Sequence, residues 1–166
     1  GKSINELFTR IPGRIIIATF ASNLYRIQQI IAASELTGRK VAVFGRSMER
    51  AIEAGIQSIL AGRHVVADVQ MIESGSGRKR FQKHGGDLHC YIADEDVSKE
   101  AKSLGTTRAI ISMQKATKLQ EGGIYAIGNA PTALLELIRL IKEGLAKPDL
   151  IIGMPVGFVS AAESKA

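Results

Sequence analysis

The sequence lacks most of the residues and patterns that reveal a protein's chemistry directly. Its 166 residues include a single cysteine, Cys90, so it offers no disulfide framework and no thiolate metal site. No apolar run approaches the length that spans a bilayer. Residues 1–10 have the pattern of an amphipathic helix rather than of a signal peptide. We therefore expect a soluble, cytoplasmic protein that does not enter a membrane.

Motifs for nucleotide binding, hydrolysis and metal chemistry are also missing. No stretch matches a P-loop or a dinucleotide fingerprint, and no serine stands in a nucleophile elbow. The histidines, His64, His84 and His89, share no metal-ligand spacing. His84 and Asp87 form a candidate acid–base pair, although surface-loop residues of this kind usually have no catalytic role. No metal or cofactor is expected from these patterns.

Basic residues outnumber acidic ones, 22 to 16, which gives a formal net charge of +6. This balance suits an acidic partner, such as RNA or a ligand with many carboxylates. The densest basic run contains Arg78, Lys79, Arg80 and Lys83. Only Phe81 interleaves it, so the run lacks the stacking platform of a single-strand reader. We interpret it as a solvated loop, and nucleic-acid binding is not expected from it.

Apolar residues make up 45% of the chain, and their spacing alternates between helical and strand periods from end to end. Capping residues and glycines delimit the predicted helices, at 1–10, 22–38, 47–60, 94–105, 109–119 and 131–143. Short apolar, β-branched runs predict strands buried on both faces, at 14–19, 41–44, 64–69, 88–92, 124–127 and 150–154. The stretch 73–87 is expected to be a long loop or a partly helical crossover, and Cys90 a small buried side chain of a strand.

Six strands separated by helices predict parallel β-α-β units with helices on both faces of one sheet. We expect a single domain with a three-layer α/β/α fold, flavodoxin-like or Rossmann-like, whose mainly parallel sheet has five to six strands. Ligands of such folds bind outside the carboxyl ends of the strands. Turns there that favour an anion, through free N–H groups at a helix N-terminus, are 19–23, 45–47 and 128–132. Simple helix capping is the more frequent role of such turns.

Four stretches in the later part of the chain form a specific pattern. They are Ala-Asp-Val-Gln-Met at 67–71, Gly-Thr-Thr-Arg at 105–108, Ala-Ile-Gly-Asn-Ala-Pro-Thr-Ala-Leu at 126–134, and residues 151–165. Through them, the chain from about residue 51 onward resembles the precorrin-8X (cobalt-precorrin-8) methylmutases of cobalamin biosynthesis. The resemblance implies a flavodoxin-like homodimer that moves a methyl group around a corrin ring with many carboxylates.

The same resemblance implies which residues lie near the corrin. These are Arg108, Asn129, Pro131, Thr132, Gly157 and Phe158. Arg108 is the candidate partner of a ligand carboxylate, because a guanidinium matches a carboxylate well. Asn129 opens a predicted helix, so an ordinary N-cap is its alternative role.

Residues 14–29 and 38–49 are similar to a different family, the β-CASP domain of ribonuclease J. This match covers about the first fifty residues, as a β-α-β fragment without the metal-binding hydrolase core. The join falls near Arg50-Ala51, inside a predicted helix. We therefore predict an engineered chimera, with a ribonuclease J-like fragment at 1–50 and a methylmutase-like fragment at 51–166.

The methylmutase resemblance also implies a catalytic histidine on the family's first strand, in a motif close to I-H-A-T-A-D. Neither 15–19 nor 41–45 contains a histidine, and none precedes His64. Because a general acid must lie within hydrogen-bond reach of its substrate, we predict no methylmutase activity. The alternatives are a methylmutase-type isomerase or corrin-binding protein, and RNA binding through Tyr25, Arg26 and Arg46.

Overall fold

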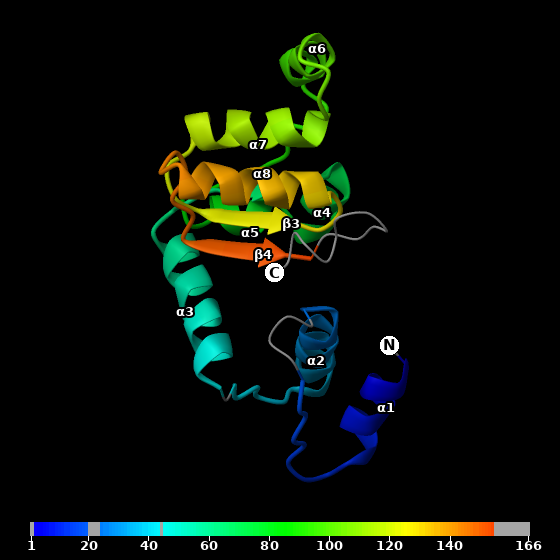
Figure 1. Cartoon of the computed structure of the whole chain (residues 1–166). Helices are drawn as coiled ribbons and strands as arrows, with labels where there is room; N and C mark the ends of the chain where they lie inside the picture. Colours follow the sequence, from blue (N-terminus) through cyan, green and yellow to red (C-terminus); the bar gives the residue numbers. More distant parts are fainter. Residues whose placement is uncertain (1, 20–23, 44, 155–166) are drawn as a thin grey trace. The chain divides into compact units, whose positions relative to one another are not determined.

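The computed structural model in Figure 1 describes residues 2–19, 24–43 and 45–154. The chain divides into two compact units, Gly1–Ala51 and Ile52–Ala166. The predicted organisation as a single domain stays a prediction. Among the described residues, no helix is both long enough and apolar enough to cross a membrane.

The first unit is built from two helices, α1 (Lys2–Arg10) and α2 (Leu24–Thr37). Ile4 and Phe8 of α1 and Ala33 of α2 form its buried cluster. Both helices agree with the apolar spacing of the sequence. The predicted Ser22 cap of α2 lies outside the described residues.

The side chain of Arg39 binds the end of α1 and the chain segment that follows it. Its Nε donates to the backbone oxygen of Phe8 at 3.2 Å, its Nη1 to that of Gly13 at 2.8 Å, and its Nη2 to that of Ile11. These carbonyls lie at or beyond the helix end, where no helical N–H can reach them. One guanidinium therefore satisfies the end of α1 and the turn after it.

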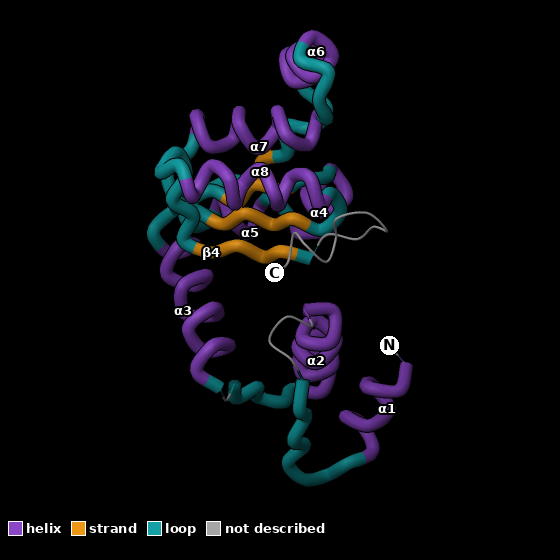
Figure 2. Tube along the Cα trace, viewed as in Figure 1, coloured by secondary structure: helices purple, strands orange, loops and turns teal. Residues whose placement is uncertain are grey.

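Two strands predicted in the first unit are wrong. Residues 14–19 and 41–43 have no strand structure, and residue 44 lies outside the described residues. Figure 2 shows both segments as loop. The side chain of Ile16 is 96% exposed. A β-branched run forms a strand only where a neighbouring strand satisfies its backbone N–H and C=O groups, and the described part of this unit supplies no such neighbour.

The second unit contains a parallel sheet with the strand order β2-β1-β3-β4. Its strands are β1 (Val65–Ala67), β2 (Leu88–His89), β3 (Ile124–Ile127) and β4 (Leu150–Gly153). Val65 pairs with both Leu88 and Ile124, and Ile124 pairs with Leu150. The α/β class with a parallel sheet is confirmed, but the described residues form four strands rather than five or six.

Helices separate the strands of this sheet. The helix that links the two units is α3 (Arg46–Leu60), and those of the second unit are α4 (Gln70–Ser76), α5 (Lys79–Gln82), α6 (Glu95–Ser103), α7 (Arg108–Leu119) and α8 (Pro131–Lys142). The predicted helices are confirmed to within a few residues, and the crossover at 73–87 is partly helical. The basic run forms α5 and its flanks rather than a loop, although its side chains are exposed.

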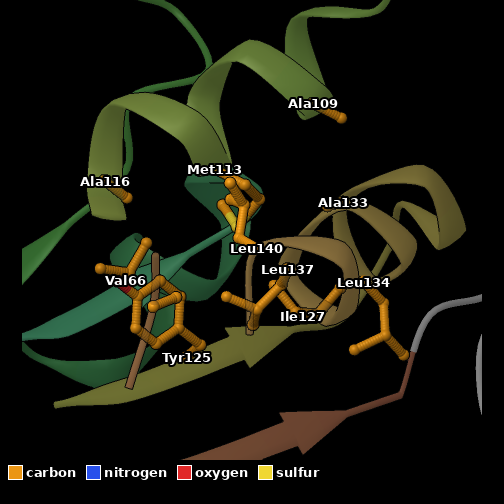
Figure 3. Packing of buried hydrophobic residues seen from close by; sticks show 11 residues of the cluster. Val66, Ala109, Met113, Ala116, Tyr125, Ile127, Ala133, Leu134, Leu137 and Leu140 are labelled. Atoms are coloured by element: carbon orange, nitrogen blue, oxygen red, sulfur yellow. The ribbon is translucent and has the colours of Figure 1, made fainter. Parts of the chain in front are cut away.

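Apolar side chains alternate between the two faces of the sheet, as the strand period of two requires. On one face, Val66 and Tyr125 pack under α7 and α8, together with Met113 and Leu137. Figure 3 shows this cluster between the two helices and β3. The opposite face carries Val65, Leu88 and Ile124 against α3 and α5. The sheet is therefore the middle of three layers.

Candidate site at the carboxyl edge of the sheet

The strand order reverses between β1 and β3. From β1 the chain continues to β2 on one side, and from β3 it continues to β4 on the other. In an open parallel sheet, ligands bind outside the carboxyl ends of the strands at such a switch point. The turns at this place begin with Asp68 after β1 and with Gly128, Asn129 and Ala130 after β3.

Asp68 connects these two turns. Its side chain is only 1% exposed. Oδ1 accepts from the N–H of Gly128 at 2.9 Å, while Oδ2 accepts from the N–H groups of Asn129 at 2.9 Å and Ala130 at 2.7 Å. Ala130 is the N-cap of α8 but makes no side-chain cap hydrogen bond. The carboxylate of Asp68, in the turn after β1, therefore binds three N–H groups of the turn that leads into α8.

Some N–H groups of the anion-binding turns predicted from the sequence are hydrogen-bonded within the chain itself. In the turn at 128–132, Asp68 accepts from the N–H groups of residues 128–130. At 45–47, the N–H of Gly45 donates to Oε1 of Glu49 at 3.1 Å. Residues 20–23 of the remaining turn lie outside the described residues. Hydrogen bonds to carboxylates of the chain itself are therefore what the structure shows at 45–47 and at 128–132.

Gly128 allows α4 to lie close to the turn after β3. A Cβ atom at this position would stand 2.7 Å from Cδ1 of Ile72 on α4, far inside normal contact distance. The next residue, Asn129, has an exposed side chain, and Pro131 and Thr132 are half-buried. Asn129 is not the N-cap of α8, so its predicted capping role is wrong: the N-cap position falls on Ala130.

Arg108 is the first residue of α7, which begins at the end of the sheet toward which β3 and β4 point (Figure 1). Thr107 caps the helix, because its Oγ1 accepts from the N–H of Ile110 at 3.3 Å. The Arg108 side chain is exposed, and within the described part of the chain it has no ion pair or hydrogen bond. A cation at a helix N-terminus opposes the helix dipole, so Arg108 does not stabilise α7. Its position suits an external anion.

The predicted acid–base pair of His84 and Asp87 is not formed. Oδ1 of Asp87 instead accepts from Nε of Arg78 at 2.7 Å and from the N–H of Leu88 at 2.8 Å. Burial raises the pKa of Asp87, but these hydrogen bonds outweigh it and hold the pKa below its usual value. Asp87 is therefore a structural carboxylate at the start of β2.

Pairing of β1 with β2 brings two other histidines together. The rings of His64 and His89 have centroids 5.1 Å apart, and His89 stacks on Tyr91 at 5.7 Å. The N–H of Asp87 donates to Nδ1 of His64 at 3.0 Å. Burial lowers the pKa of His89, which favours its neutral form. The two-residue spacing of His89 and Tyr91 is visible in the sequence, but the contact of His89 with His64 is not.

Neither a metal centre nor a reactive thiol emerges from the described residues. No group of three or more His, Cys, Asp or Glu side chains there could hold a metal ion. Cys90 is half-buried, and burial raises the pKa of its thiol. A thiol that stays protonated is a poor nucleophile. Gly157 and Phe158, two of the residues expected near the corrin, lie outside the described residues.

Together, the doubly wound sheet and the exposed Arg108 at its carboxyl edge define an α/β protein with a candidate site for an anionic ligand. The chain belongs to the precorrin-8X methylmutase family, whose sequence model matches residues 10–166. It is 67% identical over 124 residues to the cobalt-precorrin-8 methylmutase of Priestia megaterium, an alignment that covers 73% of this chain and 55% of that protein. The chain spans about half the length of the curated relatives it matches.

The fold comparison agrees with this family. A crystal structure of precorrin-8X methylmutase from Thermus thermophilus matches with a TM-score of 0.69 and 31% identity, covering 99% of this chain and 80% of that one. A separate match, 60% identical over 57 residues, is to ribonuclease J 1 of Streptococcus pyogenes. It covers 34% of this chain and only 10% of that protein, which is too short a piece to bring its activity here.

The prediction of a chimera without natural catalytic activity is contradicted by these findings. The family model begins at residue 10 and runs across the predicted join near Arg50-Ala51. The similarity to ribonuclease J 1 covers only 34% of the chain and does not by itself establish a chimera. Absence of a histidine from 14–19 and 41–45 was therefore not sufficient reason to deny the chain the family's activity.

Proposed function

We propose that this chain is a methylmutase-type isomerase of cobalamin biosynthesis, acting on a corrin that carries many carboxylates. The observation that carries the proposal is Arg108: an exposed cation at the carboxyl edge of the sheet, with no partner in the described part of the chain. Membership of the family and the name of the Priestia megaterium relative support it.

Each residue of the edge has a role in this proposal. Arg108 pairs with a side-chain carboxylate of the ring through charge-assisted hydrogen bonds. Asn129, just before α8, and Pro131 and Thr132, in its first turn, contact the ligand. Gly157 and Phe158 belong to the same site through the resemblance. The net charge of +6 favours the approach of an anionic ligand. The homodimer that the resemblance implies is part of the same proposal.

Corrin binding without turnover is a second candidate, because of where the described histidines lie. Methyl migration with protonation of a ring carbon needs a proton donor within reach of the ring. His64 precedes β1, His84 precedes β2, and His89 is stacked on Tyr91. None of the three lies in the turns after β1 or β3 or at the start of α7.

The test is a titration of the chain with a precorrin-8-type corrin, followed by absorbance, together with separation of substrate and product after incubation. Arg108→Ala should weaken binding about 10- to 100-fold, which corresponds to the loss of about 1.5–3 kcal/mol from a charged hydrogen bond. Arg108→Lys should recover part of it, since an ammonium lacks the bidentate geometry. Lys118→Ala is the matched control, an exposed cation at the other end of α7, and should bind like the parent.

The outcomes separate the two candidates. Conversion of the corrin supports the isomerase, and binding without conversion supports the second candidate. A chain that is folded by circular dichroism yet changes no corrin spectrum at any concentration contradicts both.

A further inference from the structure

We propose that Asp68 is a positioning residue whose carboxylate occupies three N–H groups of the turn that leads into α8. It thereby fixes the ligand-facing residues 129–132 and leaves Arg108 to receive the ligand's carboxylates. The identity of that ligand rests on the proposed function. The occupation of the N–H groups by Asp68 does not rest on the proposed function, and it can be tested without any corrin.

The hydrogen-bond geometry supports occupation by a carboxylate in particular. Three backbone N–H groups meet two oxygens at 2.7–2.9 Å, the distances of charge-assisted hydrogen bonds. A carboxylate presents only acceptors, whereas an amide would turn an NH₂ group toward at least one of these donors. At 1% exposure, Asp68 has lost its water, so these three hydrogen bonds are what makes its burial tolerable.

The contact of Asp68 also joins the turns that follow two neighbouring strands of the sheet. Asp68 follows β1 and its three partners follow β3, so the contact spans the switch point from one side to the other. The N–H of Asp68 also donates to the carbonyl of Ala126 on β3 at 3.2 Å, which holds the two strand ends in register. Asp68 therefore sets the separation of the two turns between which a ligand would lie.

Occupation also has a consequence for selectivity. The N-terminus of a helix normally attracts carboxylates and phosphates. In the turn that leads into α8, Asp68 already binds the N–H groups of residues 128–130, so a ligand carboxylate cannot use these three donors, and Arg108 is an exposed cation at the start of α7. A ligand whose carboxylate pairs with one cation, without a competing anion site at these N–H groups, has a better-defined orientation.

Chemical rescue tests the occupation. Asp68→Ala should leave a carboxylate-sized vacancy lined by three N–H groups, and it should lower the melting temperature by several degrees. Acetate or formate should raise that melting temperature again and return the amide NMR signals of Gly128, Asn129 and Ala130 toward their parent positions. Sodium chloride at equal ionic strength should neither raise the melting temperature nor return these amide signals. Asp68→Asn, which keeps the size of the side chain, should lose stability without being rescued.

Asp149→Ala is the matched control. Its Oδ2 also accepts a backbone hydrogen bond, from the N–H of Gly123 at 3.0 Å, and one from Oγ of Ser58 at 2.8 Å, but at the opposite edge of the sheet. This variant should lose stability as well. A corrin should bind it as it binds the parent, and should bind Asp68→Ala at least tenfold more weakly unless acetate is present.

The parent chain gives an independent measurement if neither Asp68 variant folds. On addition of corrin, the amide signals of residues 128–130 should stay in place while the Nε–H signal of Arg108 shifts. Shifts of these amides with an unchanged Arg108 would overturn the proposal, as would an Asp68→Ala variant that binds corrin like the parent. If the parent binds no corrin, the proposed function fails, and rescue by acetate still decides whether the N–H groups are a carboxylate site.

Discussion

Replacing Gly128 with alanine tests how tightly α4 closes on the turn after β3. The new Cβ would stand 2.7 Å from Cδ1 and 3.5 Å from Cγ1 of Ile72, whereas carbon atoms pack at about 3.5–4.0 Å. Overpacking of this kind costs about 1–3 kcal/mol. Gly128 does not have a left-handed backbone, so alanine adds no backbone strain and should gain about 0.4–1 kcal/mol by restricting the unfolded chain. We expect a net loss of about 1–2 kcal/mol in the free energy of unfolding.

A second substitution isolates the cause. Ile72→Val removes Cδ1, the atom in closest contact, at a cost of about 0.5–1.5 kcal/mol by itself. In that background Gly128→Ala should be neutral or slightly stabilising, which gives a coupling energy of about 1 kcal/mol or more. Gly75 on α4 is the control, because a Cβ there meets nothing within 4 Å. Gly75→Ala should stabilise by up to about 1 kcal/mol.

Urea unfolding followed by circular dichroism measures all of these variants. The steric argument is refuted if Gly128→Ala is as stable as the parent, or if it costs the same with valine at position 72. A change in the slope of the unfolding transition would instead indicate an altered unfolded state and would call for hydrogen exchange at the turn.

Three further expectations concern acid stability and the core. Arg139 donates to Glu136 and holds the pKa of this carboxyl below its ordinary value of 4.5. The ionised Glu136 therefore contributes to stability above pH 4.5, and this contribution is lost as the pH falls through the lowered pKa. Urea unfolding from pH 7 to pH 3.5 should show a smaller loss for Glu136→Gln than for the parent. Burial lowers the pKa of His89 below 6.5, so an NMR titration should place its midpoint under that value, and stability should decline as the pH falls below 6.5. Leu137 is fully buried, and Leu137→Ala should cost about 2–5 kcal/mol in urea unfolding, against less than about 0.5 kcal/mol for Leu145→Ala, whose side chain is 61% exposed.

The helices of this chain were predictable because their signals are local. Gly38, Gly62 and Gly105 follow the ends of α2, α3 and α6 and adopt the left-handed backbone that glycine tolerates, with φ between 62° and 71°. Thr107 caps α7 as its position before the helix suggests. Such features depend on a few neighbouring residues, and the sequence contains them in full.

The strands were less predictable because a strand depends on a partner. Residues 15–17 are three consecutive isoleucines, an ideal strand composition, yet they remain a loop and Ile16 is almost completely exposed. The run 124–127 has a similar composition and forms β3, since β1 and β4 lie on either side of it. Composition reports that a segment could join a sheet, and only the tertiary structure decides whether it does.

The sequence predicts a location for the site, but it does not predict the hydrogen bonds that the structure shows there. The rule that ligands bind at the carboxyl ends of parallel strands predicts the turn at 128–132. The family resemblance predicts Arg108. Asp68, which lies 60 residues before Gly128, carries no local sign of the contact that it makes. A buried carboxylate after a strand is the one general hint, because such a group requires several donors.

The hydrogen bond from the N–H of Asp87 to His64 also settles which tautomer the neutral imidazole adopts. A ring nitrogen that accepts a hydrogen bond carries no hydrogen, so the hydrogen of neutral His64 resides on Nε2. Coordination of a divalent cation by Nε2 would require the hydrogen to move to Nδ1, which would break the hydrogen bond from Asp87. Metal binding through Nε2 of His64 therefore competes with the contact that joins His64 to the start of β2.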